Sequence, residues 1–229
     1  MKRRELIKGL AAFGALAILP NMKVSGSRKN DKFHFIGLGS GGTNIARHFQ
    51  QKGIVGDYTC ITWFPSIVAP VPWATNQFDP YPFVLYEGFN HIEYEYPRHI
   101  RQANALGKQP MPLTNEMKRI LSDDRIYVVI VGLGAYSGTS LITDTLEFLE
   151  SNNKRYLAIC TLPFKNEGQN RNEYAMRKRT DLRKYGNVRF FDNNEILKKY
   201  GESRISKNFE HSDDEIYRIF EEEFPKLIS

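Results

Sequence analysis

The fold of this chain is decided by the stretch Gly37-Leu38-Gly39-Ser40-Gly41-Gly42-Thr43-Asn44. It follows a short apolar run, 33–36, and opens a stretch with helical periodicity, 43–51. Glycines let the backbone turn with positive φ and bring several N–H groups close to an anion, while the start of a helix adds a positive dipole end. The stretch therefore predicts a phosphate-binding turn between the first strand and the first helix of an α/β domain.

A second glycine loop has the same setting. It reads Gly132-Leu133-Gly134-Ala135-Tyr136-Ser137-Gly138-Thr139-Ser140, follows an apolar run at 127–131 and opens a helical stretch at 139–150. Two such loops on neighbouring strands can hold a polyphosphate between two helix N-termini, with the Ser137 and Thr139 hydroxyls as extra donors. A pair of loops at corresponding strand ends favours a ligand site over two simple turns.

Apolar strands alternate with helical stretches along the rest of the chain. This pattern predicts an α/β fold with a doubly wound, mostly parallel sheet and helices on both faces. The expected strands are 33–36, 58–62, 127–131, 156–160 and 188–191, and the expected helices are 43–51, 113–121, 139–150, 170–184 and 209–224. Residues 63–97 hold both tryptophans and six prolines, so we expect an ordered insertion without long regular elements there.

A dinucleotide-binding domain is the first alternative, because Gly37-x-Gly39-x-x-Gly42 matches its fingerprint. That fingerprint needs an acidic residue at the end of the second strand, where this chain has Thr62-Trp63. Asp57 precedes that strand and would lie at the wrong edge of the sheet. A nicotinamide-dependent oxidoreductase is therefore a remote alternative, and no Walker sequence is present.

Three ordered motifs resemble those of the tubulin/FtsZ family. The first loop is similar to that family's Gly-x-Gly-Gly-Gly-Gly-x-Asn segment, and residues 134–140 resemble its Gly-Gly-Gly-Thr-Gly-Thr-Gly signature. The stretch 161–171 is similar to Pro-Phe-x-x-Glu-Gly-x-x-Arg. The resemblance covers roughly residues 32–229. It implies the Rossmann-like, three-layer nucleotide-binding domain of this family, with GTP or GDP as the cofactor and Mg²⁺ as a further candidate.

The resemblance also implies roles for single residues. Glu167 would contact the ribose and Arg171 the phosphates, although the two could instead form an ordinary i,i+4 helix pair. Asn193, with Asn194 as the second choice, and Asp214 would recognise the base; a carboxylate accepts both guanine N–H groups, which favours guanine over adenine. The alternative for such acids is helix capping. The predicted nucleotide-binding set is Gly39, Ser40, Gly41, Gly42, Asn44, Gly134, Ala135, Tyr136, Ser137, Gly138, Thr139, Glu167, Arg171, Asn193 and Asp214.

The chain also departs from the family pattern. Thr62-Trp63-Phe64 stands where Asn-Thr-Asp is usual, and Tyr136 replaces a glycine, so its side chain must point away from the phosphates or narrow the site. The sequence ends near the end of the helix at 209–224, before the family's water-activating loop and second domain. We expect weak or partner-dependent GTP hydrolysis, by self-association or a partner protein that supplies the loop. The alternative is an interaction module with a vestigial site, binding through the insertion.

Composition and charge complete the prediction. The 229 residues are 41% hydrophobic and 25% charged, which is typical of a globular protein and excludes disordered, collagen-like and polytopic membrane chains. Five cations and one acid in the first 26 residues contribute +4 of the net +6, so the basic balance does not indicate nucleic-acid binding. Cys60 and Cys160 lie singly in apolar runs and are expected to be buried and inert; no metal site is predicted.

The N-terminus has the order of a targeting segment. Lys2-Arg3-Arg4 precedes an apolar run of 11 residues, 9–19, and then Pro20. This resembles a twin-arginine export signal of prokaryotes, and the run is too short to span a bilayer as a helix. We expect a signal or arm plus linker at 1–30 and a nucleotide-binding domain at 31–229. Membrane association or export is the expected localisation, with the cytoplasm as the alternative.

Overall fold

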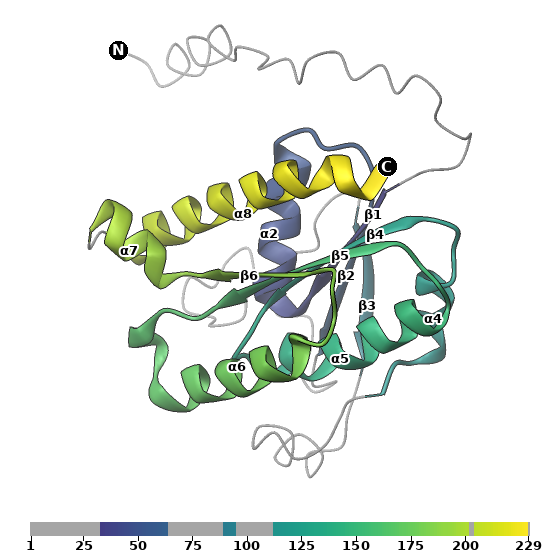
Figure 1. The fold of residues 1–229 in the computed structure, drawn as a ribbon, viewed down its shortest axis with the longest axis horizontal. Helices are drawn as coiled ribbons and strands as arrows, with labels where there is room; N and C mark the ends of the chain where they lie inside the picture. The colour runs from purple at the N-terminus through teal and green to yellow at the C-terminus, as the bar shows by residue number, and fades with distance from the viewer. Residues whose placement is uncertain (1–32, 64–88, 95–111, 202–203, 229) are drawn as a thin grey trace, which may run out of the picture. The chain divides into compact units, whose positions relative to one another are not determined.

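The computed structural model describes residues 33–63, 89–94, 112–201 and 204–228, and within them the strands form one parallel sheet of six (Figure 1). The strand order is β3-β2-β1-β4-β5-β6. The strands are β1 Phe33–Leu38, β2 Asp57–Trp63, β3 Phe89–Tyr94, β4 Ile126–Gly132, β5 Tyr156–Leu162 and β6 Val188–Asp192. The order turns back between β1 and β4, which carry the two glycine loops at their carboxyl ends.

Helices cover both faces of this sheet, as the sequence predicts (Figure 1). Helices α2 and α8 lie on one face, and α4, α5 and α6 lie on the other. The helices are α2 Gly39–Gln51, α4 Asn115–Leu121, α5 Tyr136–Ser151, α6 Gln169–Leu182, α7 Asn194–Tyr200 and α8 Ile205–Ile228, with a short 3-10 turn, η2, at Lys165–Glu167. The doubly wound α/β prediction is confirmed.

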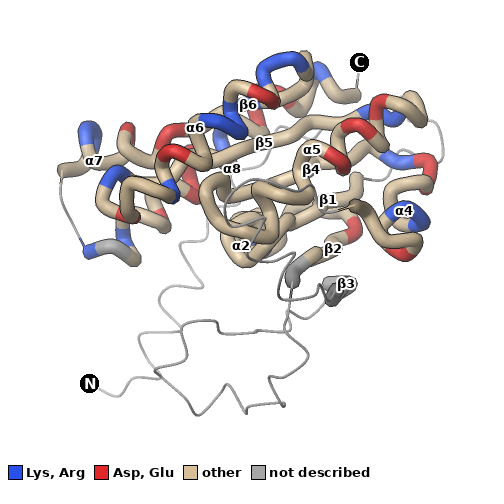
Figure 2. Tube along the Cα trace, turned by 90° about the horizontal axis from the view of Figure 1, so that it is seen from below, with Lys and Arg blue, Asp and Glu red and all other residues tan. Residues whose placement is uncertain are grey.

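Each inner strand contributes to two apolar cores. In β4, Val128 and Ile130 pack toward α2 and α8, while Val129 and Val131 pack toward α4, α5 and α6. Because both faces are covered, β1, β4 and β5 are mostly apolar on both faces rather than alternating, and they contain no Asp, Glu, Lys or Arg. Figure 2 shows the same contrast, since charged residues gather on the helices and are missing from these three strands.

Two elements and several boundaries differ from the sequence prediction. β3 lies inside the stretch expected to hold no long regular element, and it pairs with β2 in parallel. Its six residues contain no proline, so the breaker argument did not apply to them. α7 was also missed, although Glu195 lies in its first turn, Lys198 and Lys199 in its last, and Gly201 follows. Helix α8 continues past Pro225, which lies in its last turn.

Some predictions concern residues outside the described part of the chain. The expected signal or arm at 1–30 lies there, as does most of the insertion at 63–97 apart from β3. Among the described residues, no helix combines the length and apolar character needed to cross a bilayer. Both cysteines are buried, as expected.

Candidate functional site

The two glycine loops touch each other at the carboxyl ends of β1 and β4. A Cβ atom added to Gly138 would lie 2.6 Å from the carbonyl oxygen of Leu38, and one added to Gly39 would lie 3.0 Å from the nitrogen of Gly138. A Cβ added to Gly41 would lie 3.6 Å from the Cα of Gly132. Both loops therefore approach through their backbones, which only residues without side chains allow.

Helices α2 and α5 both start inside these loops, and neither has an acidic side chain in its first turn. Their N-cap residues, Leu38 and Ala135, make no side-chain capping hydrogen bond. Helix α4 differs, because Thr114 accepts a hydrogen bond from the Met117 nitrogen at 3.2 Å and Glu116 lies in its first turn. The dipole ends of α2 and α5 are thus left without a side-chain anion of their own and suit a bound phosphate.

The hydroxyls of the second loop have different roles. Thr139 is fully buried, and its Oγ1 accepts a hydrogen bond from the Gly134 nitrogen at 2.9 Å. This bond fixes the shape of the loop. Ser137 is half-buried, so it is the more accessible of the two predicted donors.

Tyr136 is half-buried at the start of α5. Its ring packs against the apolar core on the α4, α5 and α6 face of the sheet. That core includes Leu38 and Leu133, which belong to the two glycine loops. In the first loop, Ser40, Gly41 and Asn44 are exposed and Gly39 and Gly42 are buried.

The η2 turn brings Glu167 and Arg171 to the second glycine loop. A Cβ added to Gly134 would lie 2.6 Å from the carbonyl oxygen of Arg171, so the start of α6 lies directly against that loop. Glu167 Oε2 pairs with Arg171 Nη1 at 3.1 Å, and Glu167 Oε1 accepts a hydrogen bond from the Phe164 nitrogen at 2.7 Å. The i,i+4 pair is present, and the backbone of its arginine lies against the second glycine loop.

The two segments expected to recognise the base also meet. Ser212 Oγ of α8 donates a hydrogen bond to the Oδ1 of Asn193 at 2.7 Å, and Asn193 is buried at the end of β6. The side-chain amide of Asn194 is used locally, donating to the Pro163 carbonyl oxygen at 3.2 Å and to the Asp192 carboxylate at 2.6 Å.

Asp214 is engaged with helix α2. Its Oδ1 lies 3.0 Å from both His48 Nε2 and Lys52 Nζ. Partial burial would raise the pKa of Asp214, but the hydrogen bonds and charges of Lys52 and His48 outweigh it and lower that pKa. The carboxylate is held as an anion between the two helices.

The neighbouring Asp213 is in a different environment, which the sequence did not reveal. Burial, together with the charges of Asp214 and Glu210, raises its pKa to about 7. One turn earlier, Phe209 is 39% exposed and meets Phe164 edge to face with 5.2 Å between ring centroids. The available signal in the sequence was that Phe209 and Asp213 are four residues apart, which places both on one face of a helix.

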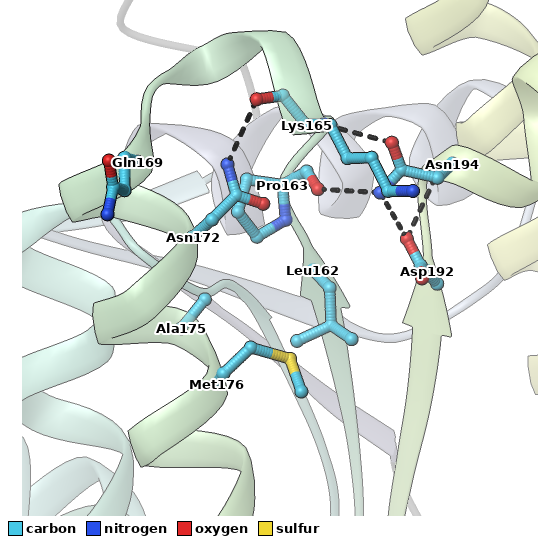
Figure 3. A pocket seen from close by; sticks show the side chains of 9 residues that line it. All are labelled: Leu162, Pro163, Lys165, Gln169, Asn172, Ala175, Met176, Asp192 and Asn194. Atoms are coloured by element: carbon cyan, nitrogen blue, oxygen red, sulfur yellow. Dashed lines mark hydrogen bonds between the residues drawn. The ribbon is translucent and has the colours of Figure 1, made fainter.

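Figure 3 shows a hollow beside the η2 turn, with a volume of about 470 Å³. Leu162, Ala175 and Met176 provide its apolar part, and Asp192 and Lys165 lie among its polar lining.

Two negative observations concern other chemistries. Asp57 is the first residue of β2, at the amino edge of the sheet, and forms an ion pair with Arg125. It lies at the opposite end of the strand from the place where a dinucleotide domain holds its ribose. Among the described residues, no group of three or more His, Cys, Asp or Glu lies together as a metal site would require.

Comparisons with known proteins relate the sequence and the fold of this chain to the tubulin/FtsZ group. No family model matches the sequence. The chain is 25% identical over 162 residues to the cell division protein FtsZ of Helicobacter pylori, which covers 64% of this chain and 36% of that protein. The solved FtsZ dimer of M. jannaschii is similar with a TM-score of 0.57 and 17% identity, covering 93% of this chain and 55% of that one.

A filament protein shares the same fold. The TubZ of Bacillus thuringiensis serovar israelensis, solved as GDP-form protofilaments, gives a TM-score of 0.53 and 13% identity, covering 84% of this chain and 56% of that one. The chain thus spans about a third of the curated relative and about half of each of these solved structures.

Proposed function

We propose that this chain, which is tubulin/FtsZ-like in sequence and fold, binds a guanine nucleotide, GTP or GDP, at the carboxyl ends of β1 and β4. One observation carries the proposal. Two glycine loops touch each other, and each opens a long helix that has neither a side-chain cap nor an acid in its first turn. Such paired helix starts offer backbone N–H groups and two positive dipole ends to one polyphosphate.

In this proposal, the phosphates lie between the loops at 39–44 and 134–139. Arg171 adds a guanidinium, since the backbone of this residue already lies against Gly134. Glu167, held by Arg171 and by the Phe164 nitrogen, accepts from the ribose hydroxyls through its remaining lone pairs. Mg²⁺ would arrive with the nucleotide, and we propose no role for a metal held by the chain.

For the base, we propose Asp213 rather than Asp214 as the carboxylate partner. Asp214 pairs with His48 and Lys52, whereas the charge of Asp213 is destabilised by burial and by neighbouring acids. The two N–H donors of guanine would stabilise that charge. Asn193, joined to α8 through Ser212, lies next to this position, and the exposed ring of Phe209 offers a stacking surface.

Calorimetric titration of the full chain with GTP, GDP, ATP and NADH tests the proposal. We expect saturable binding of the two guanine nucleotides and none of NADH. Asp213→Asn should weaken GDP binding by about tenfold, while the matched variant Asp214→Asn should change it by less than about threefold. If the chain binds no guanine nucleotide, the interaction-module alternative replaces this proposal.

A pH titration separates the two aspartates further. Guanine binding should favour the ionised form of Asp213, so its pKa should fall from about 7 and a proton should leave on binding. We expect GDP affinity to rise as the pH rises from 6 to 8, with a binding enthalpy that depends on the buffer. Unchanged affinity across this range would assign the base contact to another residue.

Assembly is a proposal that follows from the nucleotide site. The solved FtsZ is a dimer and the solved TubZ forms protofilaments, so we propose that this chain self-associates in a nucleotide-dependent way and that turnover of GTP is weak without a partner. Sedimentation velocity with GDP and with a non-hydrolysable GTP analogue tests self-association. The rate of phosphate release from GTP per protein molecule should rise with protein concentration. A rate per molecule that stays constant would contradict this proposal.

A further inference from the structure

The η2 turn carries Glu167, yet its conformation does not come from apolar packing along its whole length. Phe164, just before the turn, is buried and anchors one end. On the other side lies the hollow of about 470 Å³ bounded by Lys165 and Asn172 (Figure 3). The remaining backbone of the turn needs hydrogen bonds to hold a single conformation.

Asn172 of α6 supplies one set of these bonds. Its Nδ2 donates to the carbonyl oxygens of Gly168 at 2.9 Å, Phe164 at 3.1 Å and Lys165 at 3.4 Å. One side-chain amide therefore makes hydrogen bonds to three carbonyl oxygens in and beside the turn. A three-way contact of this kind fixes the turn relative to α6, the helix that carries Arg171.

Asn194 of α7 supplies the other set from a different part of the chain. Its Oδ1 accepts from the Lys165 nitrogen at 2.9 Å, and its Nδ2 donates to the Pro163 carbonyl oxygen at 3.2 Å. The Asp192 carboxylate accepts from the same Nδ2 at 2.6 Å and from the Asn194 nitrogen at 2.9 Å, which orients the amide. The turn is thus held from α6 and from the end of β6 together.

We infer that the side-chain amides of Asn172 and Asn194 are positioning groups that hold the η2 turn, and through it Glu167 and Arg171, in place for the nucleotide. This inference rests on the proposed function for its ligand. Neither amide touches the nucleotide in this arrangement. Each acts through the backbone of residues 163–168, whose polar groups it satisfies.

Hydrogen–deuterium exchange in the ligand-free full chain provides the first test. We expect Asn172→Ala and Asn194→Ala to speed exchange in the peptide spanning 163–168 by about tenfold, because each variant removes side-chain hydrogen bonds that hold the backbone of the turn. Asn170→Ala is the matched control, since Asn170 is exposed on the same turn of α6, and it should leave exchange unchanged. Wild-type exchange rates in both variants would overturn the inference.

Nucleotide affinity provides the second test. Asn172→Ala should weaken GDP binding by about tenfold, and Asn172→Asp should weaken it more, because a carboxylate would face three carbonyl oxygens. In a Glu167→Ala background, Asn172→Ala should cost less than about threefold, since the group that it positions is gone. An equal loss in both backgrounds would show that Asn172 does not act through Glu167.

The two tests separate this inference from the proposed function. If wild-type protein binds no GDP or GTP, the proposed function fails, and the exchange measurements still decide whether the amides hold the turn. If wild-type protein binds GDP and the asparagine variants bind it equally well, the positioning role fails and the proposed function stands.

Discussion

The two edges of the parallel sheet are built in opposite ways. At the amino edge, side chains satisfy the chain's own groups: Asp57 pairs with Arg125, the Tyr127 hydroxyl donates to the Asp123 carbonyl oxygen at 2.9 Å, and Lys154 Nζ donates to the Ser122 carbonyl oxygen at 2.6 Å. At the carboxyl edge, the N-cap residues of α2 and α5 make no side-chain capping hydrogen bond, and neither helix has an acid in its first turn.

The amino edge is thus closed by side-chain contacts, whereas the starts of α2 and α5 at the carboxyl edge lack side-chain caps. The amino edge gains from bonds that are already made in the isolated chain. In the proposed function, the backbone N–H groups and the helix dipoles at the carboxyl edge bind an anion, and the glycines add no side chains there. Variants at the two edges should therefore change different measurements.

The largest expected effect comes from a substitution at the carboxyl edge of the sheet. A Cβ at Gly42 would lie 2.1 Å from the Ile130 carbonyl oxygen, so Gly42→Ala must displace β4 or α2. We expect a loss of about 3 kcal/mol or more in the free energy of unfolding, measured with urea. Gly41→Ala is the matched control, because its Cβ would make only an ordinary 3.6 Å contact, and it should cost less than about 1 kcal/mol.

The second prediction compares how His34 and Asp213 change the free energy of unfolding with pH. His34, at the amino edge, is 2% exposed, and burial first, then the charge of Arg125, lowers its pKa to about 4. Because the folded pKa is below the unfolded value of 6.5, its contribution is complete above pH 6.5 and is lost as the pH falls toward 4. For Asp213 the folded pKa is raised, so stability is lost as the pH rises toward 7.

Between pH 5 and 6 these two contributions oppose each other, and single variants should separate them. Asp213→Asn should make the free energy of unfolding rise by about 1.4 kcal/mol from pH 5 to 6, and His34→Gln should make it fall by about the same amount. Urea unfolding of both variants at the two pH values is the measurement. Slopes of the same sign would contradict the assignment of either group.

The third prediction affects binding and spares stability. Arg171→Ala should weaken GDP binding by about 10- to 100-fold, because it removes a guanidinium beside the second glycine loop. The unfolding midpoint should move little, since Arg171 and Glu167 form a partly exposed i,i+4 pair. Arg177→Ala, an exposed arginine on the same helix, is the control, and an equal loss there would point to general charge attraction.

The smallest effect is expected at the amino edge. Asp57→Asn should lower the free energy of unfolding by about 0.5 kcal/mol, because the ion pair with Arg125 is half exposed on the Asp57 side. Nucleotide affinity should not change. If this variant weakened binding of a nucleotide by tenfold, the dinucleotide alternative, in which an acid of β2 holds the ribose, would regain support.

Several features of the fold could be read from local sequence. The apolar runs at β1, β4 and β5 and the glycine loops that follow β1 and β4 predicted the strands, the parallel sheet and the edge that carries the site. The predicted starts of α2 and α5 were a few residues late, because their first turns are formed by loop residues such as Gly39 and Tyr136. The site residues themselves stay predictions until the binding experiments are done.

Other features depended on contacts that are distant in the sequence. β3 forms by pairing with β2, and the chain around it gave no strong strand signal. Asp213 and Asp214 are adjacent, and one step along a helix turns a side chain by about 100°. Only the positions of His48 and Lys52 on α2 show which carboxylate is already paired. The surroundings of Tyr136 also depend on distant contacts, because its ring packs against a core that several elements form together.

The sequence by itself therefore determined the class of fold and the positions of the two glycine loops, because glycine spacing and apolar runs act through the local backbone. The tertiary structure decided which of the two adjacent acids pairs with His48 and Lys52, which core the Tyr136 ring packs against, and which backbone groups of the η2 turn Asn172 and Asn194 bind. Each of these depends on a partner that lies on another element, and hydrogen bonds and ion pairs form only when folding brings the two partners within about 3 Å.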